Sequence, residues 1–143
     1  MRINKFFSVF LSLLIVCSIF GGLSVSATTI DKTHTYTVVG DAPFLGAKWD
    51  PTTVADDMVV QWDGTYKKTY TNVSKSDCYS IKVTENHDWS VNFGSNLGEN
   101  DPQNIEFSVP MDNSTVDVIL TLKGTRNKDG KVITDGFVKV LVD

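Results

Sequence analysis

The fold prediction starts from Val116-Asp117-Val118-Ile119-Leu120-Thr121-Leu122, the longest β-branched run in the chain. Residues of this type fit a pleated, half-buried surface, so the run is expected to form a central strand. Its expected partner is the segment 132–142, which is reached through Asn127-Lys128-Asp129-Gly130, a sequence typical of a turn. We therefore expect an antiparallel pair near the C-terminus.

Shorter β-like segments precede this pair, with turn-forming residues between them. Asp63-Gly64 is typical of a hairpin turn, in which positive φ is required. Helical signal is weak and amounts to one turn at residues 52–57. Seven or eight short strands predict an all-β fold, an immunoglobulin-like antiparallel β-sandwich. The other expected strands are residues 36–39, 58–61, 65–73, 78–84, 89–93 and 103–109.

Side-chain alternation indicates which face of each strand is buried. In the run Cys78-Tyr79-Ser80-Ile81-Lys82-Val83-Thr84, the large apolar residues alternate toward the core and Lys82 is expected on the opposite face. Cys78 is interpreted as a buried, inert thiol, because no base lies beside it in the sequence. Residues 65–73 lack a cleanly apolar face, which favours a position near an edge.

The N-terminal segment has the pattern of a secretory signal peptide, residues 1–27. A basic start at Arg2 and Lys5 precedes an apolar run over residues 6–20 and small residues up to Ala27. Cleavage after Ala27 would leave residues 28–143 as a single secreted, extracellular domain. Cys78 would then be its one cysteine, so an internal disulfide is not expected.

The charge balance is acidic. The chain has 13 basic and 17 acidic residues and a net charge of −4, and removal of Arg2 and Lys5 lowers this by two to −6. Nucleic acids and anionic membranes are bound by clustered lysines and arginines, so neither is expected as a partner once the leader is removed.

The segment His87-Asp88-Trp89-Ser90-Val91-Asn92-Phe93-Gly94-Ser95-Asn96-Leu97-Gly98 combines aromatic rings with hydrogen-bonding side chains and turn residues. A sugar offers an apolar face of C–H groups and a rim of hydroxyls, so its binding site needs flat rings together with amides or ammonium groups. Trp89, Asn92 and Lys82 are predicted to supply these groups. His87 and Phe93 complete the predicted ligand-binding residues of this segment.

The three tryptophans lie in or beside predicted turns and have polar neighbours. Each could pack in the core, as a tryptophan commonly does in β-sandwiches. Burial of all three rings at such positions would also bury the polar residues beside them, which is unfavourable. Exposed aromatic rings commonly mark binding sites. We therefore predict Trp49 and Trp89 as the ligand platform, with a weaker case for Trp62.

Two chemical alternatives are less well supported by the sequence. Residues 127–130 partly match a calcium-binding loop but lack the distal glutamate, so a hairpin turn is favoured and no metal or cofactor is expected. His87-Asp88 could form half of a catalytic arrangement, yet the sequence shows no matching nucleophile or carboxylate pair. The chain is therefore predicted not to be an enzyme.

Several short segments, taken in order, resemble the starch-binding accessory modules of bacterial pullulanases and gut amylosome proteins. They are Val39-Gly40-Asp41, Leu45-Gly46-Ala47-Lys48-Trp49-Asp50-Pro51, Asp63-Gly64-Thr65-Tyr66, Tyr79-Ser80-Ile81-Lys82-Val83 and Trp89-Ser90-Val91-Asn92-Phe93-Gly94. The resemblance implies a non-catalytic β-sandwich that binds starch, glycogen or maltooligosaccharides, and an association with extracellular amylases. It also implies that Trp49 and Trp89 form the platform while Lys82 and Asn92 bond sugar hydroxyls.

The chain departs from that family pattern in its C-terminal hairpin through Gly130, which is longer than expected, and at two further places. Asp77-Cys78 stands where the family tends to have glycine, and Phe93 stands where it usually has tyrosine, so one hydroxyl is lost. An extracellular protein-interaction or adhesion domain of the same fold is the alternative function, because the same aromatic residues could contact another protein.

Overall fold

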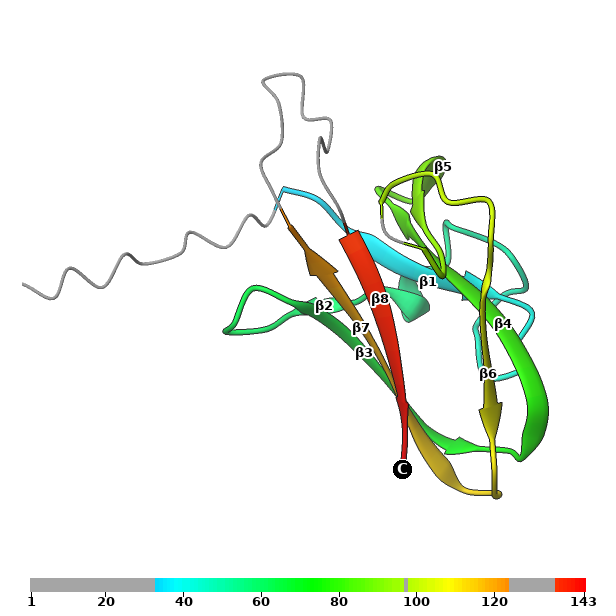
Figure 1. Ribbon diagram of the computed structural model, residues 1–143. Coiled ribbons are helices and arrows are strands. Elements are labelled where there is room, and N and C mark those ends of the chain that lie inside the picture. The colour runs from blue at the N-terminus through cyan, green and yellow to red at the C-terminus, as the bar shows by residue number, and fades with distance from the viewer. Residues whose placement is uncertain (1–32, 97, 124–135) are drawn as a thin grey trace, which may run out of the picture.

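Eight strands and one 3₁₀-helix are present in the computed structural model, which describes residues 33–96, 98–123 and 136–143 (Figure 1). The predicted signal peptide and the turn at residues 127–130 lie outside these residues, as do residues 132–135 of the last predicted strand. No helix in the described ranges has the length and apolar character needed to cross a membrane. The elements are β1 Tyr36–Gly40, η1 Val54–Asp56, β2 Val59–Val60, β3 Tyr66–Val73, β4 Ser76–Glu85, β5 Asp88–Phe93, β6 Ile105–Val109, β7 Ser114–Leu122 and β8 Gly136–Val142.

The strands form two antiparallel sheets, which confirms the predicted β-sandwich. One sheet has the order β2-β3-β7-β8, and in the other β4 lies between β1 and β5. β6 also pairs with β4, over Ser76 to Ile81, where β5 does not reach. As predicted, β7 is an inner strand and its C-terminal partner is β8.

The core lies between the sheets and follows the alternation of side chains along the strands. In β7, Val116, Val118 and Leu120 are fully buried, whereas the residues between them are only partly buried. Ile81 and Val83 of β4 are likewise fully buried. Removal of these side chains from water is the main favourable contribution to folding.

β3 lies one strand inside the edge of its sheet, since the two-residue strand β2 covers its first residues. Tyr66 and Tyr70 point into the core. The pairing register with β7 shifts between Tyr70 and Val73, and Asn72 has a φ of 57°. This irregularity turns Val73 into the core, which explains why simple alternation found no apolar face.

The outer face of β4 is also covered, which the sequence did not predict. Lys82 and Thr84 of β4 alternate away from the core but are only 8% and 0% exposed. Val39 of β1, which pairs with Lys82, is 0% exposed. In Figure 1 the loop between β1 and β2 runs past β4 on the side away from β7 and β8. Lys82 thus lies on the predicted face of its strand, but this face is buried.

The prediction that Cys78 is buried is wrong, because its side chain is exposed. β1 pairs only with residues Ile81 to Glu85 of β4, so it does not extend alongside Cys78. The pairing of β4 with β6 is also irregular between Ser76 and Tyr79. The thiol therefore lies at an uncovered end of the strand.

We expect Leu120→Ala to lower the free energy of unfolding by about 2–5 kcal/mol, because it leaves a cavity in the core. Ile119→Ala removes the same number of carbon atoms from a half-buried position on the other face of β7. Ile119→Ala should therefore lower the free energy of unfolding clearly less than Leu120→Ala does. Urea unfolding measures both changes, and equal losses would contradict the assignment of the two faces.

Candidate functional site

Trp49 and Trp89 lie side by side although 40 positions separate them in the sequence. Their ring centroids are 6.4 Å apart and their planes are tilted by 36°. Trp89 is 41% exposed, and Trp49 is partly exposed. Thus the two predicted platform residues form one aromatic pair at the surface.

The backbone around Trp49 is held in an uncommon conformation. Trp49 has a φ of 51°, which few residues other than glycine adopt. Its N–H donates to the carbonyl oxygen of Gly40 at 2.8 Å, which ties the loop to the end of β1. The next residue, Asp50, accepts bonds from the hydroxyl and the N–H of Thr52 at 2.7 and 2.9 Å, and these bonds lower the pKa of Asp50. The indole is therefore presented by an ordered loop.

Trp89 is displaced from regular strand pairing by two features. Asn86 and His87, between the paired residues Glu85 and Asp88, have φ of 54° and 57°, as the centre of a type I′ turn requires. Asn92 then pairs with Thr84, so three residues of β5 bulge between consecutive positions of β4. Trp89 is the first residue of this bulge.

The bulge is held by short-range bonds. Asp88 accepts bonds from the hydroxyl and the N–H of Ser90, the latter at 2.7 Å, and these bonds lower the pKa of Asp88. The side-chain amide of Asn92 donates to the carbonyl oxygen of Trp89 at 3.2 Å. Trp89 is thus fixed from both sides along the chain.

Lys82 and Asn92 are bonded to the protein itself. The Lys82 ammonium donates to Asn92 Oδ1 at 3.0 Å and to the carbonyl oxygen of Asp101. Burial lowers the pKa of Lys82, and the negative charge of Asp101 opposes this shift. Both bonds of the ammonium are made to protein groups, and direct contact of Lys82 with a ligand stays a prediction. Through Asn92, Lys82 is linked to the backbone of Trp89.

Asp101 organises the loop between β5 and β6. Its carboxylate accepts bonds from the N–H and side-chain amide of Asn96, at 2.5 and 3.0 Å, and from the N–H of Gln103 at 2.9 Å. Burial raises the pKa of Asp101, but these bonds and the charge of Lys82 outweigh it and the pKa is lowered. Asp101 is therefore a structural anion beneath the candidate site.

The prediction that Phe93 binds ligand is wrong. Phe93 pairs with Val83 of β4 and is 0% exposed, with its ring 6.3 Å from that of Tyr36. A Cβ added to Gly136 would lie only 2.6 Å from Phe93 Cε1, so β8 packs closely on the ring. Phe93 belongs to the core because the bulge ends before it and normal alternation resumes.

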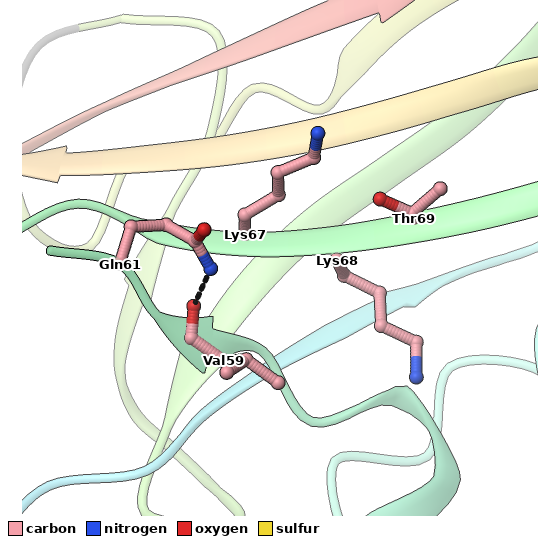
Figure 2. A pocket seen from close by; sticks show the side chains of 5 residues that line it. All are labelled: Val59, Gln61, Lys67, Lys68 and Thr69. Carbon is pink, nitrogen blue, oxygen red and sulfur yellow. Dashed lines mark hydrogen bonds between the residues drawn. The ribbon is translucent and has the colours of Figure 1, made fainter.

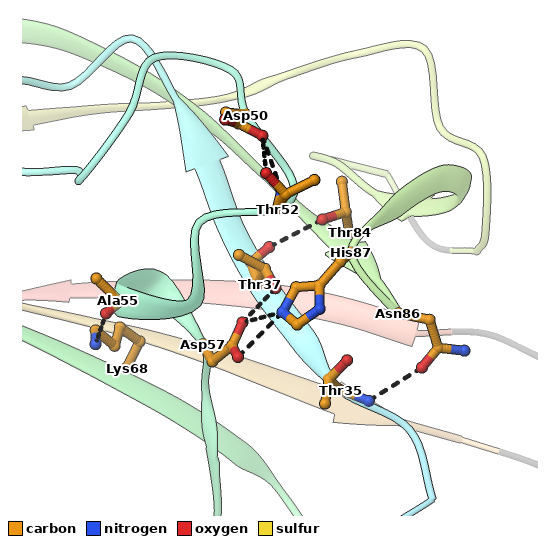
Figure 3. A network of polar contacts seen from close by, with 10 residues as sticks. All are labelled: Thr35, Thr37, Asp50, Thr52, Ala55, Asp57, Lys68, Thr84, Asn86 and His87. Atoms are coloured by element: carbon orange, nitrogen blue, oxygen red, sulfur yellow. Dashed lines mark hydrogen bonds and ion pairs between the residues drawn. The ribbon is translucent and has the colours of Figure 1, made fainter.

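His87 is paired with Asp57, which precedes β2 (Figure 3). Its Nε2 lies 2.8 and 3.1 Å from the two carboxylate oxygens, and the hydroxyl of Thr37 donates to the same carboxylate at 2.6 Å. A nucleophilic hydroxyl would instead need to donate to the imidazole, and Thr37 is fully buried. This arrangement joins the turn after β4 to the chain before β2.

Sequence inspection missed three residues that hold the site together, namely Asp57, Asn100 and Asp101. Asn100 has a φ of 58°, and its side-chain oxygen accepts a bond from the Asn92 amide at 3.4 Å. Its own N–H donates to the carbonyl oxygen of Asn92 at 2.6 Å. The turn-forming sequence Glu99-Asn100-Asp101-Pro102 indicated a structured loop. It could not show that Asn100 bonds Asn92 or that Asp101 bonds Lys82.

A scan against protein-family models and a search of curated proteins found no match to this chain. Among the described residues, no group of three or more His, Cys, Asp or Glu side chains is arranged to hold a metal ion.

Replacement of Asp101 by asparagine should change how stability depends on pH. Because the folded-state pKa of Asp101 is lowered, its contribution is present above the unfolded value of about 3.9 and is lost as the pH falls through the folded value. Asp101→Asn should therefore be less stable near neutral pH and lose less further stability on acidification. Urea unfolding from pH 7 to 3 measures this difference, and parallel pH profiles would contradict it.

Proposed function

We propose that this chain is a secreted, non-catalytic module that binds starch or related α-glucans at Trp49 and Trp89. The observation that carries the proposal is the partly exposed pair of rings, 6.4 Å apart and tilted by 36°. Flat apolar rings suit the C–H faces of sugars, and a few polar groups beside them can bond the hydroxyls. The resemblance to starch-binding modules points to the same ligand class.

The tilt of the rings favours a curved polymer over a flat one. Successive glucose units of an α-1,4-glucan turn relative to each other, so two inclined rings can each meet the face of a different unit. A flat β-glucan strand would fit coplanar rings better. Starch and maltooligosaccharides are therefore the favoured ligands.

Further polar contacts would come from groups beside the rings. Lys48 is exposed and precedes Trp49, and Asp88 and Ser90 are exposed on either side of Trp89. A lysine and a carboxylate offer both donors and acceptors to sugar hydroxyls. The rigid backbone at both tryptophans reduces the ordering cost of binding.

Such a module would hold a polysaccharide close to extracellular amylases. Each contact between a module and a glucan segment would be weak. An insoluble polymer presents many glucan segments at high local concentration, and this would favour retention of the module. Catalysis has no part in this role.

Trp89→Ala should reduce retention on insoluble starch at least about tenfold, because a central aromatic contact commonly contributes more than 1.4 kcal/mol. Trp89→Phe keeps a stacking ring and should retain most of the binding. Pull-down on starch, with cellulose as the comparison polymer, measures both variants.

Equal retention of wild type and Trp89→Ala would remove Trp89 from the site. Absence of wild-type retention on starch would refute the proposed function. If maltoheptaose also left the tryptophan fluorescence unchanged while a surface protein shifted it, the adhesion alternative would take its place.

A further inference from the structure

Trp62 is exposed at the tip of the hairpin between β2 and β3. It is 92% exposed, more than any other large hydrophobic residue in the described ranges, and it has no part in the Trp49–Trp89 pair. Single exposed apolar residues are common, but an indole this exposed adds little to the core and is accessible to a ligand.

The turn that carries Trp62 is ordered by its own hydrogen bonds. The N–H of Gln61 donates to the carbonyl oxygen of Thr65 at 2.7 Å, and the N–H of Gly64 donates back to Gln61 at 3.1 Å. Asp63 accepts bonds from the N–H and hydroxyl of Thr65 at 3.0 and 2.7 Å. The backbone around Trp62 is thus organised before any ligand arrives, which lowers the cost of binding.

An open cavity of about 410 Å³ adjoins this turn through Gln61 (Figure 2). Its volume lies in the range of small-ligand sites. It combines the apolar side chain of Val59, which is 64% exposed, with amide, ammonium and hydroxyl groups. The lining residues are Val59, Gln61, Lys67, Lys68 and Thr69.

The polar side chains at this cavity suit a ligand with many hydroxyl groups. Lys67 Nζ lies 2.6 Å from Asp117 Oδ2, and the hydroxyl of Thr69 donates to Asp117 Oδ1 at 2.6 Å. Lys68 donates to the carbonyl oxygen of Ala55. The charge of Lys67 is thus paired with a carboxylate, whereas Lys68 keeps its charge beside a neutral carbonyl, and these ammonium groups are donors that sugar hydroxyls can accept.

We propose that Trp62 and this cavity form a second subsite for α-glucan, and this inference rests on the proposed function. The hairpin belongs to the β2-β3-β7-β8 sheet, whereas Trp49 and Trp89 adjoin the other sheet. Figure 1 shows the hairpin and β5 on different sides of the molecule. The two subsites would therefore hold separate polymer segments and raise retention on insoluble starch through avidity.

The indole N–H resonances of the three tryptophans can test this inference ring by ring. On titration of the full domain with maltoheptaose, we expect the Trp62 resonance to shift along with those of Trp49 and Trp89. Trp62→Ala should leave the other two shifts intact and lower retention on insoluble starch at least about tenfold, through lost avidity. Met111→Ala, which removes another exposed apolar side chain at 63% exposure, is the matched control and should have no effect.

The outcomes separate this inference from the proposed function. A stationary Trp62 resonance with moving Trp49 and Trp89 resonances would overturn the second subsite alone, as would unchanged starch retention of Trp62→Ala. Movement of Trp62 alone would support the second subsite and refute the Trp49–Trp89 site. If no resonance moved and starch did not retain the wild type, both would be refuted, and a protein partner would remain for the exposed rings.

Discussion

Burial of both faces of β4 is the constraint on which the candidate site depends. Ile81 and Val83 pack into the core, while Lys82 and Thr84 are buried on the opposite face. A strand covered on both sides must satisfy every polar group that it carries, because an unpaired buried charge is costly. Lys82 meets this requirement by bonding Asn92 and the backbone of Asp101.

The same bonds explain why an aromatic pair can be held at the surface. Asn92 links the Lys82 ammonium to the backbone of Trp89, and Asp101 organises the loop that follows β5. The bulge in β5 then moves Trp89 out of the ladder, next to a ring that comes from the loop after β1. The polar groups next to the rings hold the backbone in place, so under the proposed function the ligand would contact the exposed indoles and their neighbours.

Two aromatic surfaces in one small domain would suit a polymer better than a short ligand. The Trp49–Trp89 pair rests on a network that includes a buried charge, whereas Trp62 stands on a turn held by local hydrogen bonds. A long glucan presents many equivalent segments, so separate weak contacts can act together. The contact between His87 and Asp57 joins the turn after β4 to the chain before β2, and it is not part of either aromatic surface.

The sequence by itself determined the β-sandwich, the approximate positions of its strands and the pairing of β7 with β8, because alternation and turn chemistry are local properties. It also placed Trp49 and Trp89 beside turns, and their role in binding stays a prediction. Tertiary structure alone decided what lies over each strand face. Phe93 entered the core because the bulge in β5 ends before it, and Lys82 was buried because its outward face is covered. Cys78 stayed exposed because β1 pairs only with the far end of β4. These outcomes depend on strand lengths, bulges and loop paths, which arise from contacts between residues far apart in the chain.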